Sequence, residues 1–260
     1  MIKYYIEMRS SKMEHFFLLG EDLPENIGIQ MYGVEHLAWL AAAAVACVAL
    51  CLIYRRRTQP DRLRMGLVIA VIITALQIWR IIFQINGGVF GMDYLPFHLC
   101  DVAQALVLIH AIRGGKLIGE FLYCLGLSGA ACALIFPDWT RYPILNIQSL
   151  QSFITHILLT AYIIMMVAGG EIRPNAKRLP KCVLMLLAFA VPIYIFNKVF
   201  DTNFFFANYP SPGSPLEPFE SLLGNPGYLL GIIPILAVLW VVLYLPFEVA
   251  RRHRRKYNER

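Results

Sequence analysis

Charged residues are scarce in this chain. They make up 15% of its 260 residues, whereas soluble domains contain about 25%. Hydrophobic residues make up 58%, against roughly 45–50% in soluble domains, and they occur in long runs. This balance excludes an ordinary soluble domain and predicts a single-domain integral membrane protein that crosses its membrane several times, in the cell membrane.

The cysteines lack the spacing typical of disulfide frameworks or zinc sites. None of the six forms a CxxC pair, and most lie inside apolar runs, where cysteine is commonly a small buried hydrophobe. They are Cys47, Cys51, Cys100, Cys124, Cys132 and Cys182. We therefore expect neither kind of site. Nothing in the sequence indicates a cofactor.

An apolar segment directly after the first charged residues is also lacking. We therefore expect residues 1–33 to form an extracytoplasmic or interfacial segment with a short helix, rather than a cleaved signal peptide. Seven apolar segments follow, and each approaches the ~20 residues that a helix needs to cross ~30 Å of hydrocarbon. They are residues 34–54, 65–85, 95–113, 116–136, 148–169, 181–200 and 227–247. The sequence thus predicts an all-α membrane protein, a seven-transmembrane-helix bundle over 34–247.

Two details of these segments matter for the site. The third segment is the shortest, and Pro96 suits the first turn of its helix. Only residues 113–116 separate it from the fourth segment, and the Gly-Gly pair there permits a tight turn.

The formal charge of +6 could suggest nucleic acid as a partner. The basic residues lie instead between apolar segments, where they set topology and contact anionic lipid heads, so we expect no nucleic-acid partner. They follow the first, third, fifth and seventh segments, while the opposite loops are nearly free of them. This pattern predicts an N-terminus outside, a C-terminus inside and a basic cytoplasmic tail at 248–260.

One stretch gathers most of the chemically active side chains. Residues 93–104 place Asp, His, Cys and Gln beside an apolar run, and an ionisable group inside a bilayer costs about 2.5 kcal/mol or more, so such groups usually mark a functional interior. Under the predicted topology, most other intramembrane polar residues also lie near the outer ends of their segments. These are His36, Gln77, Arg80, Gln84, His156 and Asn225. We therefore expect a polar cavity in the outer half of the bundle.

Helical spacing sorts these residues further. His98 and Asp101 share a face, so Asp101 can orient the imidazole. Cys100 lies roughly 200° around the helix from His98, so a base for Cys100 must come from another helix, and His156 and His36 are the candidates. The fifth segment carries a polar stripe over residues 148–156, which should face the interior.

Each residue also has an ordinary structural interpretation. Cys100 can be a packing cysteine, His98 and Asp101 a hydrogen-bonded pair between helices, and His156 a core histidine. Arg80 can extend to the outer lipid heads. No spacing supports a metal site. The loop 201–226, which alternates aromatic residues with prolines, is either a stiff lid over the cavity or a structured interface loop.

Three patches of the sequence carry a family resemblance. They are residues 95–101 (LPFHLCD), residues 129–156 with Pro137-Asp138 and the end QSFITH, and residues 203–214 together with Asn225-Pro226. With these the chain resembles the YwaF-type family of bacterial integral membrane proteins, which is similar to the eukaryotic transmembrane protein 164 family. The resemblance implies a multi-helix membrane fold and, for the eukaryotic relatives, acyl transfer onto ether-lysophospholipids with a cysteine as acyl carrier.

Carried over, the resemblance makes Cys100 the nucleophile, with membrane phospholipids as partners. The spacing favours His156 as its base over His98. Gln104, Asn225 or Arg80 can supply oxyanion donors, and Arg80 can alternatively hold a lipid phosphate. Gln77 and His36 complete the predicted cavity.

Two other functions remain open at this point. A transporter or ligand-binding protein would use the same polar residues to hold a solute, although no internal repeat is evident. A structural role in an envelope complex is the other. The sequence leaves open whether the chain is an enzyme, its acyl donor and acceptor, and its oligomeric state.

Overall fold

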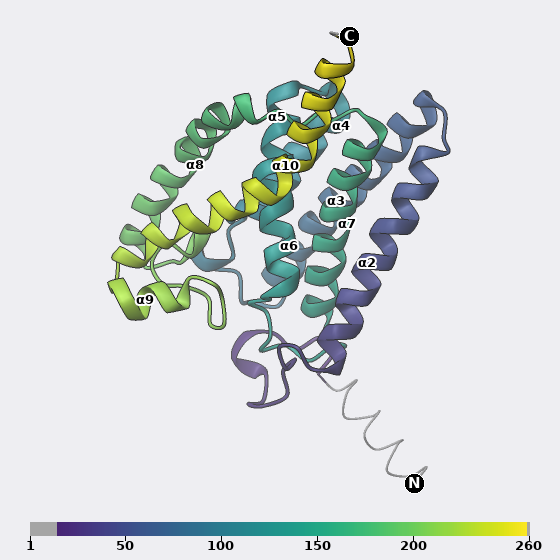
Figure 1. The fold of residues 1–260 in the computed structure, drawn as a ribbon. Coiled ribbons are helices and arrows are strands. Elements are labelled where there is room, and N and C mark those ends of the chain that lie inside the picture. Colours follow the sequence, from purple (N-terminus) through teal and green to yellow (C-terminus); the bar gives the residue numbers. More distant parts are fainter. Residues whose placement is uncertain (1–14, 259–260) are drawn as a thin grey trace. The chain divides into compact units, whose positions relative to one another are not determined.

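The computed structural model describes residues 15–258, and every regular element in that range is a helix (Figure 1). Residues 1–14, which hold much of the predicted interfacial segment, lie outside the described residues, as do 259 and 260. The α-helices are α2 (Val34–Arg55), α3 (Gln59–Asn86), α4 (Leu99–Arg113), α5 (Lys116–Phe121), α6 (Leu127–Ile135), α7 (Ile147–Gly169), α8 (Leu179–Phe200), α9 (Glu217–Leu223) and α10 (Ile232–Asn258).

The described residues pack as two compact units. The first contains residues 15–95 and 130–165, and therefore α2, α3 and most of α6 and α7. The second contains residues 96–129 and 166–258, and therefore α4, α5, α8, α9 and α10. Each unit is described by itself below.

The core of the first unit is aromatic. Trp39 of α2 stacks on Phe153 of α7 with ring centroids 4.8 Å apart, and Trp139 meets the same ring edge-on at 5.1 Å. Ala43, Leu134 and Ile157 complete this cluster. The turn from α2 to α3 is closed by Arg62, whose guanidinium donates to the carbonyls of Tyr54 and Arg55 at 3.1 and 2.8 Å. The Tyr54 carbonyl also accepts from the Arg57 backbone N–H at 3.1 Å, so Arg62 adds to the hydrogen bonds that close the end of α2.

The second unit contains the tight turn that the Gly-Gly pair predicts. Gly114 and Gly115 have φ of +66° and +118°, a region that favours glycine, and they join α4 directly to α5. A π-helical turn, η3 (Leu122–Gly126), then connects α5 to α6. It widens the helix by one residue and leaves the Cys124 carbonyl to accept from Trp240 Nε1 at 3.0 Å.

Six helical segments of the described chain are long and apolar enough to cross a membrane. They are Val34–Arg55, Gln59–Asn86, Lys116–Ile135, Ile147–Gly169, Ala176–Phe200 and Gly227–Arg251. Each matches a predicted segment. The third predicted segment is helical only from Leu99 to Arg113, about 22 Å at 1.5 Å per residue, which is shorter than the hydrocarbon core. The seven-span count and the orientation of the termini therefore stay predictions.

Several predicted boundaries differ from the observed ones. α3 begins at Gln59, so Arg62 and Arg64 lie in its first turns rather than in a loop. Pro96 precedes α4 instead of opening it, because the chain is still extended at Leu95 and His98. α10 continues to Asn258, so most of the predicted tail is helical. The loop 201–226, predicted to be stiff rather than helical, contains a 3₁₀ turn, η5 (Phe204–Phe206), and the short helix α9.

Helix α9 packs against the 3₁₀ turn η6 (Gly227–Gly231) that leads into α10 (Figure 1). The contact is close, since a Cβ atom on Gly231 would lie 2.4 Å from Cγ of Phe219. A glycine is therefore needed at the end of η6.

Candidate functional site

The start of α4 is built around an extended residue and a capping carboxylate. His98 is the N-cap, with φ −66° and ψ 157°, and its backbone N–H donates to Oδ2 of Asp101 at 3.0 Å. A carboxylate in the first turn also complements the positive end of the helix. Through this oxygen Asp101 caps the helix, because an acidic side chain three residues into a helix reaches the N-cap amide readily. That Asp101 also orients the His98 imidazole stays a prediction.

Aromatic side chains cover the His98 imidazole. The ring centroids of Phe204 and Phe206, both from η5, lie 5.1 and 5.5 Å from it. Phe204 is only 1% exposed, and it also contacts Phe97 at 5.5 Å. The loop 201–226 therefore folds back over the start of α4. Phe204 therefore packs inside the protein.

Cys100 follows as the second residue of α4. It is half-buried and forms no disulfide. A Cβ atom on Gly129 would lie 3.8 Å from its sulfur and 3.3 Å from Cδ2 of Leu99. A small residue at this position lets the start of α6 approach α4 closely. The first turn of a helix favours negative charge, so the position suits a thiolate.

Gln104 lies one turn after Cys100 and on the same side of α4. It is 5% exposed, and its side-chain oxygen has no hydrogen-bond partner in the described part of the chain. A buried amide group without a partner is unfavourable, and such groups often contact a bound molecule. Gln104 is therefore the best-placed polar group beside the thiol.

Asn225 has a structural contact instead. The residue is exposed, and its side-chain amide donates to the Asn208 carbonyl. Asn208 in turn donates to the carbonyls of Asn197 and Thr202, at 3.2 and 2.7 Å. These contacts hold the loop 201–226 in place, and a role of Asn225 toward a substrate stays a prediction.

His156, on α7 in the first unit, has a defined tautomer. Its Nδ1 lies 2.7 Å from the Ser152 carbonyl, and its ring stacks on Trp139 with centroids 5.0 Å apart. Because a carbonyl only accepts, Nδ1 must carry the proton, and in the neutral ring Nε2 is then the basic nitrogen. This is the arrangement that a general base requires.

His36, also in the first unit, is engaged at both nitrogens. Nδ1 accepts from the Tyr32 backbone N–H at 2.9 Å, and Nε2 lies 2.8 Å from the Leu134 carbonyl. The residue is fully buried. With both nitrogens used by the backbone, His36 links α2 to α6 and leaves no basic nitrogen for a substrate.

The remaining candidates lie on α3 in the first unit. Gln77, Arg80 and Gln84 are spaced by three and four residues and therefore share one face. Gln77 and Arg80 are half-buried, and Gln84 is 5% exposed. Since Cys100 belongs to the second unit, its convergence with Arg80 and His156 stays a prediction. In the part of the chain that the structure describes, no group of three His, Cys, Asp or Glu residues could hold a metal ion.

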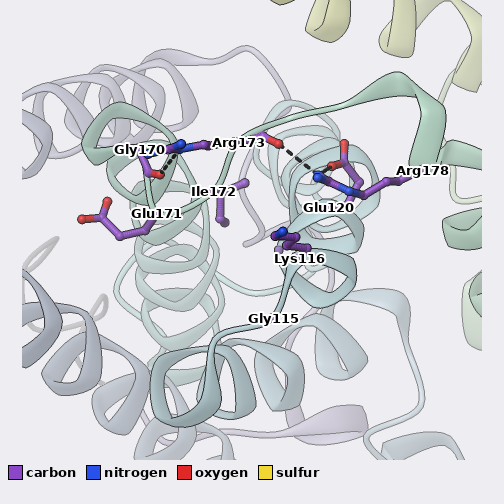
Figure 2. Close-up of a pocket in the computed structure, with 9 residues that line it drawn as sticks. Gly115, Lys116, Glu120, Gly170, Glu171, Ile172, Arg173 and Arg178 are labelled. Carbon is purple, nitrogen blue, oxygen red and sulfur yellow. Dashed lines mark hydrogen bonds and ion pairs between the residues drawn. The ribbon is translucent and has the colours of Figure 1, made fainter.

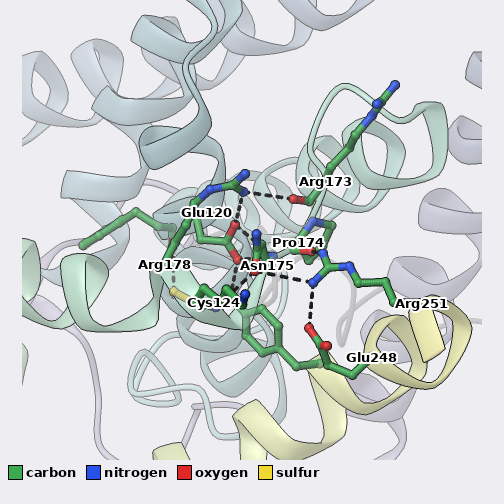
Figure 3. Close-up of polar contacts among 11 residues, drawn as sticks. Glu120, Cys124, Arg173, Pro174, Asn175, Arg178, Glu248 and Arg251 are labelled. Atoms are coloured by element: carbon green, nitrogen blue, oxygen red, sulfur yellow. Dashed lines mark hydrogen bonds and ion pairs between the residues drawn. The ribbon is translucent and has the colours of Figure 1, made fainter. Parts of the chain in front are cut away.

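Sequence reasoning missed a buried carboxylate at the other end of the second unit. Glu120 is 1% exposed and pairs with Arg178 at 2.7 Å. It also accepts from the Asn175 backbone N–H, at 2.9 and 3.1 Å, and from the Tyr244 hydroxyl at 2.5 Å (Figure 3). A lone acidic residue inside an apolar segment was the available signal. The contacts join α5, the loop before α8, and α10.

The comparisons with known proteins give one match. The model of the TMEM164 family matches residues 31–244. No curated protein and no solved structure matches the chain. The matched range contains all the candidate residues discussed above.

Proposed function

We propose, on the premise that the chain belongs to the TMEM164 family, that this multi-pass membrane protein is a lipid acyltransferase or acyl hydrolase with Cys100 as its nucleophile. In this proposal the chain is of the bacterial YwaF type. It crosses the cell membrane seven times, with its N-terminus outside. The observation that carries the proposal is the position of Cys100 in the first turn of α4, with the buried amide of Gln104 one turn away.

The reaction proceeds in two transfers. His156 Nε2 takes the proton of the Cys100 thiol, and the thiolate attacks the carbonyl carbon of a phospholipid ester. A C–S bond forms, the ester C–O bond breaks, and the leaving alcohol takes the proton back from the imidazolium. A lysophospholipid hydroxyl, or water, then attacks the thioester, which gives a new ester or a free fatty acid and restores the thiol.

The surrounding residues support these steps. The side-chain NH2 of Gln104 donates to the oxyanion that forms at the ester carbonyl, while its Oε1 can accept from the hydroxyl of the acceptor lipid. Arg80 holds the lipid phosphate, for which a guanidinium is well suited. Phe204 and Phe206 cover the adjacent His98 and keep water from the reacting groups.

The test is acyl transfer by the purified chain in lipid nanodiscs that contain an isotope-labelled phospholipid and a lysophospholipid. Cys100→Ser should reduce the transfer at least ~10²-fold and abolish a hydroxylamine-sensitive acyl adduct on the Cys100 peptide. Cys51→Ser, at another half-buried cysteine, should keep wild-type activity. Full transfer by Cys100→Ser would exclude the covalent mechanism.

A second function, solute binding or transport, is favoured by one observation in the first unit. Gln148 Nε2 and Ser149 Oγ, at the start of α7, are buried polar atoms without hydrogen-bond partners among the described residues. Gln84 Oε1 on α3 is a third. Such atoms suit a polar solute. In that case Gln148→Leu would reduce solute binding or transport, whereas Cys100→Ser would leave it unchanged.

A further inference from the structure

A pocket of about 450 Å³ lies in the second unit between the start of α5 and the loop that follows α7 (Figure 2). Its size is within the range of ~300–1,000 Å³ that is usual for small-molecule sites. It is lined by Gly115, Lys116, Gly119, Glu120, Gly170, Glu171, Ile172, Arg173 and Arg178. None of these residues takes part in the proposed acyl transfer.

One cation of the pocket lining forms an ion pair within the protein, and two others are exposed. Arg178 is matched by Glu120 at 2.7 Å, and the other contacts of that carboxylate come from Asn175 and Tyr244. The positive charge of Arg178 is therefore largely cancelled by the Glu120 carboxylate. Lys116 and Arg173 are exposed cations in the lining. In Figure 2, the Glu171 carboxylate points away from Lys116 and Arg178. With the three cations Lys116, Arg173 and Arg178 against the carboxylates of Glu120 and Glu171, the lining carries a net positive charge.

The backbone holds these cations at the rim. Gly115, which precedes Lys116, and Gly170, which precedes the loop, have φ of +118° and +88°. A Cβ atom on Gly170 would meet nothing within 4 Å, so the space beside it is open. Arg173 Nε donates to the Gly170 carbonyl at 3.1 Å, which fixes the near end of its guanidinium. The guanidinium has further N–H donors on its two terminal nitrogens, and these can bind a ligand.

We infer that this pocket binds a phosphate group through Lys116 and Arg173, the natural source being the head group of an anionic phospholipid. A guanidinium and an ammonium that share one pocket are suited to phosphate oxygens. Basic pockets between transmembrane helices on the cytoplasmic side are typical lipid head-group sites. The pocket lies at the ends of the two apolar segments that flank it, Lys116–Ile135 and Ile147–Gly169, which is where a head group sits. A free phosphate compound is the other possible source of the same chemistry.

The test is a native mass spectrometry titration of the detergent-solubilised full chain with dioctanoyl phosphatidylglycerol and, separately, dioctanoyl phosphatidylcholine. We expect tighter binding of phosphatidylglycerol. Lys116→Gln with Arg173→Gln should weaken it about 25-fold, since each surface cation contributes about fivefold. The matched control, Lys177→Gln with Lys181→Gln, removes two exposed charges outside the pocket and should weaken it less than ~3-fold.

Equal losses in the two double variants, or equal affinity for both lipids, would overturn the inference. Arms with inorganic phosphate and with glycerol 3-phosphate identify the source. Binding of either compound alone, lost in the pocket variant only, supports a soluble phosphate. Binding that needs the acyl chains supports the lipid. Thermal unfolding of both double variants at the wild-type temperature shows that the helices are intact.

Discussion

The three histidines near the predicted site differ in what their ring nitrogens contact, and this separates their roles. His36 uses both nitrogens on backbone groups. His156 uses one nitrogen on a carbonyl, and His98 presents its ring to two phenyl groups. A histidine acts as a base only through a nitrogen that carries a lone pair and can reach the substrate. This criterion excludes His36, and the choice of His156 as the base stays a prediction.

This role of His156 predicts the reactivity of Cys100. His156→Gln should slow modification of Cys100 by a lipid-like maleimide at pH 7 by ~10²-fold, because general-base assistance typically contributes 10²–10⁴-fold. Mass spectrometry of the Cys100 peptide over time gives the rate. The control is His253→Gln, which changes an exposed histidine and should leave the rate unchanged. An unaltered rate in His156→Gln would remove this histidine from the mechanism.

The sequence identified the residues of α4 better than their partners. Cys100, His98 and Gln104 could be found because a polar cluster inside an apolar run is conspicuous. The contact of Asp101 with a backbone amide could not, since spacing alone does not tell whether a carboxylate meets a side chain or the N-cap. The predicted sharing of one cavity by Cys100 and His156 depends on how the helices pack, which neither spacing nor composition defines.

At the scale of elements, a buried side chain of α8 holds the 3₁₀ turn η5 of the loop 201–226. Asn197, fully buried on α8, donates to the Phe204 carbonyl at 2.8 Å. Its side-chain oxygen accepts from the Thr202 hydroxyl and from the Phe204 backbone N–H, at 2.8 and 3.0 Å. The amide therefore fixes η5 directly above the start of α4.

Loss of this amide should open the loop. Asn197→Ala removes three hydrogen bonds, each worth about 1 kcal/mol, so we expect modification of Cys100 by a water-soluble maleimide to become at least ~10-fold faster. Ser221→Ala, on the exposed face of α9, is the control and should behave as wild type. The same labelling rate in Asn197→Ala and wild type would mean that the loop does not cover the thiol.

The Glu120 network should be the main polar determinant of stability in the second unit. Glu120→Gln leaves Arg178 facing a neutral amide in a buried site, and breaking a buried pair costs about 3 kcal/mol or more. The expected decrease in Tm is roughly 6–12 °C, measured by thermal unfolding in detergent. Glu248→Gln provides the comparison. It breaks a half-exposed pair with Arg251 and should lower Tm by less than ~4 °C. Equal decreases would contradict a special role for Glu120.

The positions of the long helices were predictable because length and hydropathy define them. The predicted segment 34–54 corresponds to Val34–Arg55, and 148–169 corresponds to Ile147–Gly169. Helix ends were less predictable. From the sequence, we expect loops at the polar first turns of α3 and at the basic end of α10. Both segments are helical. The π-helical turn was not expected either, since Leu122–Gly126 reads as ordinary helix and the extra residue is stabilised by contacts with α10.

At the scale of the whole molecule, the number of membrane spans depends on whether α4 crosses the membrane. The helix itself spans about 22 Å, less than the ~30 Å of hydrocarbon. The backbone before it is extended at Leu95 and His98, and non-helical backbone at membrane depth is tolerated where protein covers it. Phe204 packs on Phe97 and His98. A crossing by this segment, and with it the count of seven spans, stays a prediction.

The two topologies place the later loops on opposite sides of the membrane. If α4 crosses, the loops that hold Arg57 and Lys177 face the cytoplasm, in keeping with their basic residues, and the loop 201–226 faces outward. If α4 does not cross, Arg57 and Lys177 lie on opposite sides. All three labelling positions, Arg57, Lys177 and Tyr209, are exposed. We expect a membrane-impermeant maleimide to modify Tyr209→Cys on intact cells, and to modify Arg57→Cys and Lys177→Cys only after permeabilisation. Modification of Lys177→Cys but not Arg57→Cys on intact cells would show that α4 does not cross.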